Sequence, residues 1–143
     1  MTSKNRALLL EHGLFLSWAI SLIATLGSLY LSEIMRFPPC DLCWWQRIFM
    51  YPLVVILGIA TVRKNNAIVA YTLPLSLIGG SISIYHYMKQ KLPYYQSKAD
   101  TCSIIPCNID YLDWFGFITI PLLALIAFAL ISIIHIALWK AQK

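Results

Sequence analysis

Long apolar blocks, separated by short polar segments, dominate the chain. Four of them lie at 13–31, 44–62, 67–87 and 115–139, and each contains about 20 residues. A helix of about 20 apolar residues is long enough to cross the hydrocarbon core of a bilayer. The pattern therefore predicts an all-α, integral membrane four-helix bundle, with outer loops at 32–43 and 88–114.

The composition agrees with a membrane protein of one domain. Hydrophobic residues make up 59% of the 143 residues and charged residues 12%, against about 25% charged in soluble domains. We found no repeat or second domain, so 1–143 is expected to be a single unit. Lys4 and Arg6 precede the first block as in a secretory signal, but the block is long and lacks a small-x-small cleavage site, so we expect an uncleaved helix.

Basic residues are concentrated on one side of the four predicted spans. The three short segments on the side of the termini carry Lys4, Arg6, Arg63, Lys64, Lys140 and Lys143. On the other side the basic residues are spread over longer loops and are balanced by acidic ones. Because Lys and Arg in short loops favour the cytoplasm, both termini are expected there, in a multi-pass protein of the cell membrane. The basic pI is then a sign of topology and lipid contact, and we expect no nucleic-acid partner.

All four cysteines fall in the two outer loops, where disulfides persist. They are Cys40, Cys43, Cys102 and Cys107. Two structural disulfides or a four-cysteine zinc site are alternatives to thiol exchange. A C-x-x-C disulfide closes a ring too small to remove much chain entropy, and structural zinc usually supports small soluble modules. We therefore prefer exchange and expect no metal.

The stretch PPCDLCWWQR at 38–47 combines a dithiol with a fixed positive charge. Two prolines keep the approach extended, so a helix is expected to begin around the cysteines, with its unpaired amides and positive dipole end beside a thiol. Such an environment favours the thiolate. Arg47 follows Cys43 by four residues and shares its helical face. It either stabilises the thiolate and an electron acceptor or reaches the lipid headgroups, and the residues alone leave both roles open.

A dithiol that becomes a disulfide must pass on two electrons and two protons. The chain contains no G-x-G-x-x-G dinucleotide motif, whereas a quinone dissolved in the membrane needs no soluble domain. It would reach the C-x-x-C at the depth of Trp44, Trp45 and Tyr51, although these aromatics equally suit the ordinary interfacial belt.

Haem is the rival acceptor, because histidines are common axial ligands. His12 and His135 lie near the predicted cytoplasmic ends, and His86 lies at the outer end. No second outer histidine pairs with His86, and nothing couples the inner pair to the thiols. A quinone is therefore preferred.

Taken together, these features resemble the DsbB family of disulfide-bond formation proteins, most of all its short, Gram-positive BdbC-type branch. The resemblance rests on CDLCWWQR at 40–47 opening the second span, the two-cysteine second loop, and WFGFxxxP at 114–121 opening the fourth span. It implies a bound quinone, menaquinone or ubiquinone, beside the C-x-x-C. It also implies an extracytoplasmic thioredoxin-fold oxidase of the DsbA or BdbD type as redox partner.

The family's roles transfer to matching positions of this chain. The resemblance makes Cys40 and Cys43 the quinone-reducing pair, and Arg47 and His86 residues of the quinone site. It makes Cys102 and Cys107 the pair that exchanges with the partner, with Cys102 forming the mixed disulfide. Only four residues separate this second pair here, fewer than in longer members, and a strained disulfide in so short a loop would be more oxidising.

The expected function is thus a membrane thiol:disulfide oxidoreductase that reoxidises its partner and passes the electrons to a quinone. Two alternatives are a non-enzymatic scaffold with structural disulfides and an enzyme like the quinone-epoxide reductases. The latter place their C-x-x-C late in the bundle, unlike this chain.

Small residues and prolines predict details of the bundle. Close helix packing is expected at Gly27, Ser28, Gly79, Gly80 and Ser83. Bends are expected where Pro52, Pro74 and Pro121 fall inside the spans.

Overall fold

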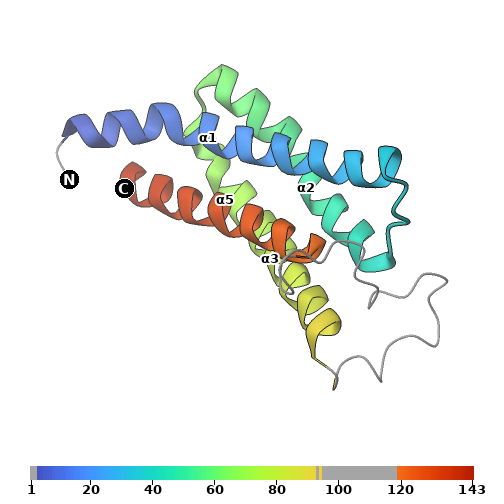
Figure 1. Cartoon of the computed structure of the whole chain (residues 1–143). Helices are drawn as coiled ribbons and strands as arrows, with labels where there is room; N and C mark the ends of the chain where they lie inside the picture. Colours follow the sequence, from blue (N-terminus) through green and yellow to red (C-terminus); the bar gives the residue numbers. More distant parts are fainter. Residues whose placement is uncertain (1–2, 93, 95–118) are drawn as a thin grey trace.

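The computed structural model describes residues 3–92, 94 and 119–143. Helix α1 (Ser3–Leu29) continues into a short π-helical segment, η1 (Tyr30–Ile34). It is followed by α2 (Asp41–Arg63), the 3₁₀ turn η2 (Asn66–Ile68), α3 (Val69–Lys91) and α5 (Ile120–Gln142). Figure 1 shows the helices in this order along the chain.

The all-α membrane fold predicted from the sequence is confirmed. Within the described residues, four helical stretches are long and apolar enough to cross a membrane, namely Asn5–Ile34, Asp41–Arg63, Asn66–Lys91 and Ile120–Gln142. Helix α1 begins at Ser3, well before the apolar block that starts at residue 13. Good helix formers such as Lys, Arg, Leu, Ala and Glu fill this polar extension, and they continue a helix without being apolar.

The four long helices form a closed ring of neighbours. α1 packs on α2, α2 on α3, α3 on α5, and α5 on α1. The interior holds fully buried apolar side chains that include Leu53, Leu57, Phe128, Ile131 and Leu138.

Polar side chains point inward and many large apolar ones point outward. Ser76 and Ser132 are buried, and their hydroxyls lie 3.0 Å apart between α3 and α5. Val62 and Tyr71, by contrast, are 86% and 76% exposed. This distribution fits a bundle surrounded by lipid, where interhelical hydrogen bonds satisfy interior polar groups and apolar side chains face the acyl chains.

One end of the bundle, here called the terminal end, gathers the two chain termini and the turn between α2 and α3 (Figure 1). Arg6 Nη2 donates to the carbonyl oxygen of Ala141 at 2.7 Å, and Gln142 Nε2 donates to that of Asn66 at 2.7 Å. The turn is tight because α2 ends in a left-handed residue, Lys64 (φ 50°), with the Asn65 amide donating back to the Ala60 carbonyl. The opposite end, which carries Cys40 and Cys43, is called the dithiol end.

The predicted small-residue contacts are only partly present. A Cβ added at Gly79 would overlap the ring of Phe128, so α3 and α5 approach closely there as expected. At Gly27, no atom of another helix among the described residues lies within 4 Å of such a Cβ, and the prediction of close packing there was wrong. Gly27 instead borders a cavity, and its neighbour Ser28 binds an arginine.

Gly79→Ala is therefore expected to destabilise the bundle by about 1–3 kcal/mol, because the added Cβ would overlap the ring of the buried Phe128 and force it to shift. The measurement is the midpoint of unfolding of the purified protein in detergent. Gly80→Ala is the matched control: its Cβ would lie 3.6 Å from Phe128 Cβ, an ordinary contact, and alanine is favoured in helices. Equal midpoints for the two variants would contradict the close approach of α3 and α5.

The three prolines that were expected to bend helices lie in two kinds of position. Pro52 and Pro74 lie inside α2 and α3, as predicted. Pro121 lies in the first turn of α5, and the prediction that it bends a helix from within was wrong. First-turn residues have no intrahelical acceptor for their amides, so proline costs nothing there and favours the start of the helix.

Candidate functional site

The site begins with the local structure around the two cysteines of α2. Cys40 is the N-cap residue, with extended backbone (φ −77°, ψ 171°), and its carbonyl accepts the Trp44 amide at 3.1 Å. Cys43 lies in the first turn. The expectation that the helix begins at the cysteines is confirmed. The positive end of the helix dipole therefore lies beside both sulfur atoms, where it favours negative charge.

The two cysteines are present as a closely spaced dithiol. Their Sγ atoms lie 3.2 Å apart. Cys40 is 5% exposed and Cys43 is half-buried. A small rotation of either side chain brings the sulfur atoms to bonding distance, so the pair can interconvert between dithiol and disulfide.

His86 of α3 adjoins the dithiol. Its Nε2 lies 3.6 Å from Cys40 Sγ, and its Nδ1 lies 3.3 Å from the side-chain amide of Gln46. His86 is 1% exposed and Gln46 is 6% exposed. With Gln46 orienting one ring nitrogen, the other is directed at Cys40, where it can donate to a thiolate or accept a thiol proton.

Arg47 is held against α1. Its Nε donates to Ser28 Oγ at 3.0 Å, and its Nη2 donates to the Ser28 carbonyl oxygen at 3.1 Å. The guanidinium also lies over the Trp44 ring, 5.4 Å from its centroid. These contacts use the planar fork of arginine, which a lysine ammonium cannot reproduce. The contacts hold the guanidinium against α1, and the role of Arg47 toward the thiolate or an electron acceptor stays a prediction.

A cavity of about 480 Å³ lies beside these groups, between the helices at the dithiol end. Cys40, Cys43, Arg47 and His86 all border it, and most of its remaining wall is apolar. The volume is in the range of about 300–1,000 Å³ that is typical of small-molecule sites. The structure thus brings together, around one cavity, every predicted site residue that lies within its described part.

Two further residues that line the same cavity, Tyr51 and Thr119, carry hydroxyl groups. The hydroxyl oxygens of Tyr51 and Thr119 are buried, and neither has a hydrogen-bond partner among the described residues. Buried polar atoms without partners are uncommon and call for an explanation.

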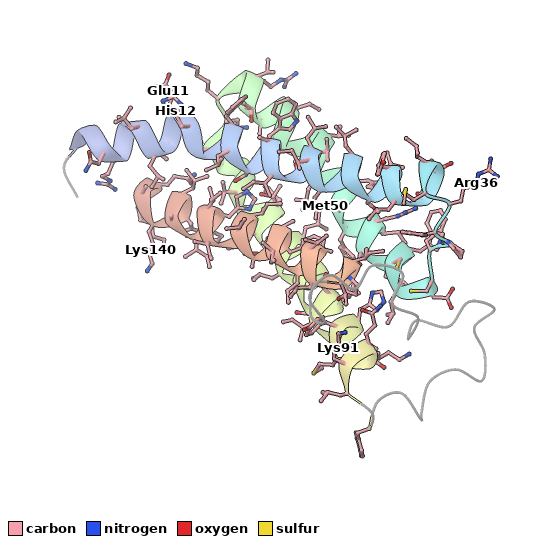
Figure 2. The ribbon with its side chains drawn as sticks, in the orientation of Figure 1. Glu11, His12, Arg36, Met50, Lys91 and Lys140 are labelled. Carbon is pink, nitrogen blue, oxygen red and sulfur yellow. The ribbon has the colours of Figure 1, made fainter. Side chains whose placement is uncertain are left out.

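The two other histidines considered as haem ligands lie in different surroundings. His12 is exposed on α1, near Glu11 (Figure 2). His135 is fully buried in α5, with Nδ1 3.4 Å from the Thr72 hydroxyl. Among the described residues, the one group of His, Cys, Asp or Glu side chains close enough to share a metal ion is Cys40, Cys43 and His86.

Comparison with known proteins matches the sequence to one family. The model of "Disulfide bond formation protein DsbB" matches residues 11–138. The chain belongs to the DsbB family. It is 54% identical to disulfide bond formation protein C of Bacillus subtilis over 140 residues, which cover 98% of both chains.

Other relatives support the same assignment. A probable disulfide formation protein C 1 of Bacillus anthracis is 54% identical over 86% of this chain and 88% of its own. A probable disulfide formation protein of Coxiella burnetii is 42% identical over 87% and 86%. No solved structure matches the chain. The family resemblance inferred from the sequence is confirmed, and with it a role in disulfide-bond formation for this multi-pass membrane protein.

Some residues of this DsbB-family site were not predicted. Gln46 and Ser28 were missed, although Gln46 follows Cys43 by three residues and so shares its helical face. Trp44 and Trp45 are more than half exposed and do not border the cavity, whereas Tyr51 does. The second predicted pair, Cys102 and Cys107, lies outside the described residues.

Proposed function

We propose that this DsbB-family protein is a quinone-dependent thiol oxidase. It reoxidises an extracytoplasmic thioredoxin-fold oxidase of the DsbA or BdbD type and passes the electrons to a membrane quinone. The observation that carries the proposal is the cavity bordered at once by the Cys40–Cys43 dithiol, Arg47 and His86.

The residues around the cavity suit a quinone. Its ring is flat and apolar, with two carbonyl oxygens that accept hydrogen bonds. Apolar walls match the ring, Arg47 brings a charged donor to the cavity wall, and Tyr51 and Thr119 are among the lining residues. When bound, a quinone supplies an acceptor for two electrons and two protons.

The chain's own groups account for the rest of the chemistry. Forming the Cys40–Cys43 bond releases two electrons and two protons. His86 Nε2, 3.6 Å from Cys40 Sγ, takes up the proton of that thiol. The helix dipole and the Arg47 guanidinium stabilise the negative charge of the Cys43 thiolate and of the reduced acceptor.

Electrons enter through the second cysteine pair. In the proposed sequence one thiolate of the reduced partner attacks Cys102, which opens the Cys102–Cys107 disulfide, forms a mixed disulfide and frees the Cys107 thiol. The partner's second thiolate then displaces Cys102, so the partner becomes oxidised and both loop cysteines become thiols. That pair in turn reduces the Cys40–Cys43 disulfide, so each disulfide broken in one protein is balanced by one formed in the next. This route assigns protein recognition to the second loop and quinone chemistry to the bundle.

The proposed oxidase requires the dithiol end to face outside the cytoplasm, with both termini inside. The asymmetry of basic residues supports this orientation. A membrane-impermeant thiol reagent should label the reduced cysteines in intact cells. Labelling that appears only after permeabilisation would contradict both the orientation and the oxidase role.

The direct test uses the purified protein with a reduced thioredoxin-fold oxidase and a soluble quinone. We expect one quinone reduced for each partner disulfide formed, with many turnovers per enzyme. A scaffold with structural disulfides would show no turnover. An enzyme of the quinone-epoxide-reductase kind would in addition reduce the quinone epoxide, with its dithiol as the reductant.

A further inference from the structure

We infer that Cys40, Cys43 and His86 form a Zn²⁺ site in the dithiol state of the protein, where the ion competes with disulfide formation. The inference concerns metal binding and stands apart from the quinone reaction. It also revises the expectation of no metal drawn from the sequence, where the zinc site considered was a set of four cysteines.

The ligand atoms are already arranged close to what zinc requires. The Sγ atoms of Cys40 and Cys43 are 3.2 Å apart, Cys40 Sγ and His86 Nε2 are 3.6 Å apart, and all three ligand atoms lie within 4.8 Å of one another. Tetrahedral zinc with bonds of about 2.3 Å to sulfur and about 2.1 Å to nitrogen needs separations of about 3.8 Å and 3.6 Å. A small rotation of one thiol therefore suffices.

The surroundings of His86 resemble those of a metal-binding histidine. Such a residue usually holds its second ring nitrogen in a hydrogen bond, which orients the ring and leaves the first nitrogen for the metal. Gln46 occupies this place, 3.3 Å from Nδ1. Turning its amide by 180° presents the oxygen to an Nδ1–H, because the amide carries a donor and an acceptor on equivalent positions.

A fourth ligand has space in the cavity, which borders all three residues and can hold a water molecule on the metal. Two thiolates and an imidazole match the preference of Zn²⁺ for sulfur and nitrogen, with one position left open. Binding displaces two thiol protons and occupies both sulfur atoms. A zinc-bound dithiol therefore cannot transfer electrons until the metal leaves.

The test measures Zn²⁺ binding to the reduced, purified protein by competition with a chromophoric chelator, without any turnover. Because Cys102 and Cys107 are thiols too, the measurements use a Cys102→Ser/Cys107→Ser background. We expect one Zn²⁺ per chain in the dithiol state and none after oxidation of Cys40 and Cys43. Cys40→Ser should abolish binding, and Gln46→Leu should weaken it roughly ten- to a hundredfold.

Histidine substitutions separate this site from simple chelation by a dithiol. His86→Gln should weaken binding at least as much as Gln46→Leu, whereas His12→Gln, at an exposed position on α1, should leave it unchanged. Unchanged affinity in His86→Gln would overturn the inference, as would binding that survives oxidation. If a His86 or Gln46 variant fails to fold, Co²⁺ added to the reduced Cys102→Ser/Cys107→Ser protein decides the question. The expected spectrum is that of tetrahedral cobalt with thiolate charge-transfer bands, and the absence of that spectrum refutes the site.

Discussion

Cys40→Ala and Cys43→Ala are each expected to abolish quinone reduction with every thiol substrate, protein or small. The two sulfur atoms lie 3.2 Å apart at the wall of the cavity, and losing either one leaves no disulfide to form beside the acceptor. Cys102→Ala and Cys107→Ala should block turnover with the thioredoxin-fold partner but leave activity with a small dithiol that reaches the first pair directly. The measurement is quinone reduction by each variant with each substrate.

The difference in activity between the protein partner and the small dithiol is what distinguishes the roles of the two cysteine pairs. Cys43 is half-buried, so a small dithiol has a route to the first pair that a protein partner lacks. An equal loss of quinone reduction with the protein substrate and the small dithiol, in all four variants, would argue against two cysteine pairs with separate functions. Full activity of Cys40→Ala or Cys43→Ala would show that the dithiol at the start of α2 takes no part in the reaction.

Substitutions of Arg47 are expected to have the next largest effect. Arg47→Lys keeps the charge but cannot make the two hydrogen bonds to Ser28, so the apparent KM for quinone should rise and kcat/KM should fall. Arg47→Met, which also removes the charge, should do more damage. Losing one charged hydrogen bond costs about 1.5–3 kcal/mol, or roughly ten- to a hundredfold in kcat/KM. The measurement is quinone-titrated turnover in native-like lipid.

Two companion variants make the Arg47 result specific. Ser28→Ala removes one of the two acceptors and should produce a smaller loss of the same kind, since Ser28 positions the guanidinium. Arg36→Met, at an exposed arginine that extends away from the bundle in Figure 2, should be neutral. Wild-type kinetics in both Arg47→Lys and Arg47→Met would indicate instead that Arg47 reaches the lipid headgroups and does not serve the quinone site.

The sequence by itself determined the fold class and the position of the dithiol at the start of a helix. In a bilayer every backbone polar group must be satisfied within its own segment, so four apolar blocks of helix-spanning length already imply four helices. The C-x-x-C preceded by two prolines likewise placed the dithiol at the start of a helix, because proline cannot continue one. Both conclusions depend on residues close together in the chain.

The composition of the site was decided by the tertiary structure. Gln46 and His86 are 40 residues apart, and only the packing of α2 on α3 places the Gln46 amide and Cys40 on either side of one imidazole. Ser28 was predicted as a small packing residue, yet the rotation of α1 against α2 makes it the acceptor for Arg47. Gly27 and Gly79 are indistinguishable as residue types, but one borders a cavity and the other meets Phe128. Hydropathy specifies which segments enter the membrane, whereas the rotation of each helix about its axis depends on side-chain contacts between distant segments, and those contacts form the cavity.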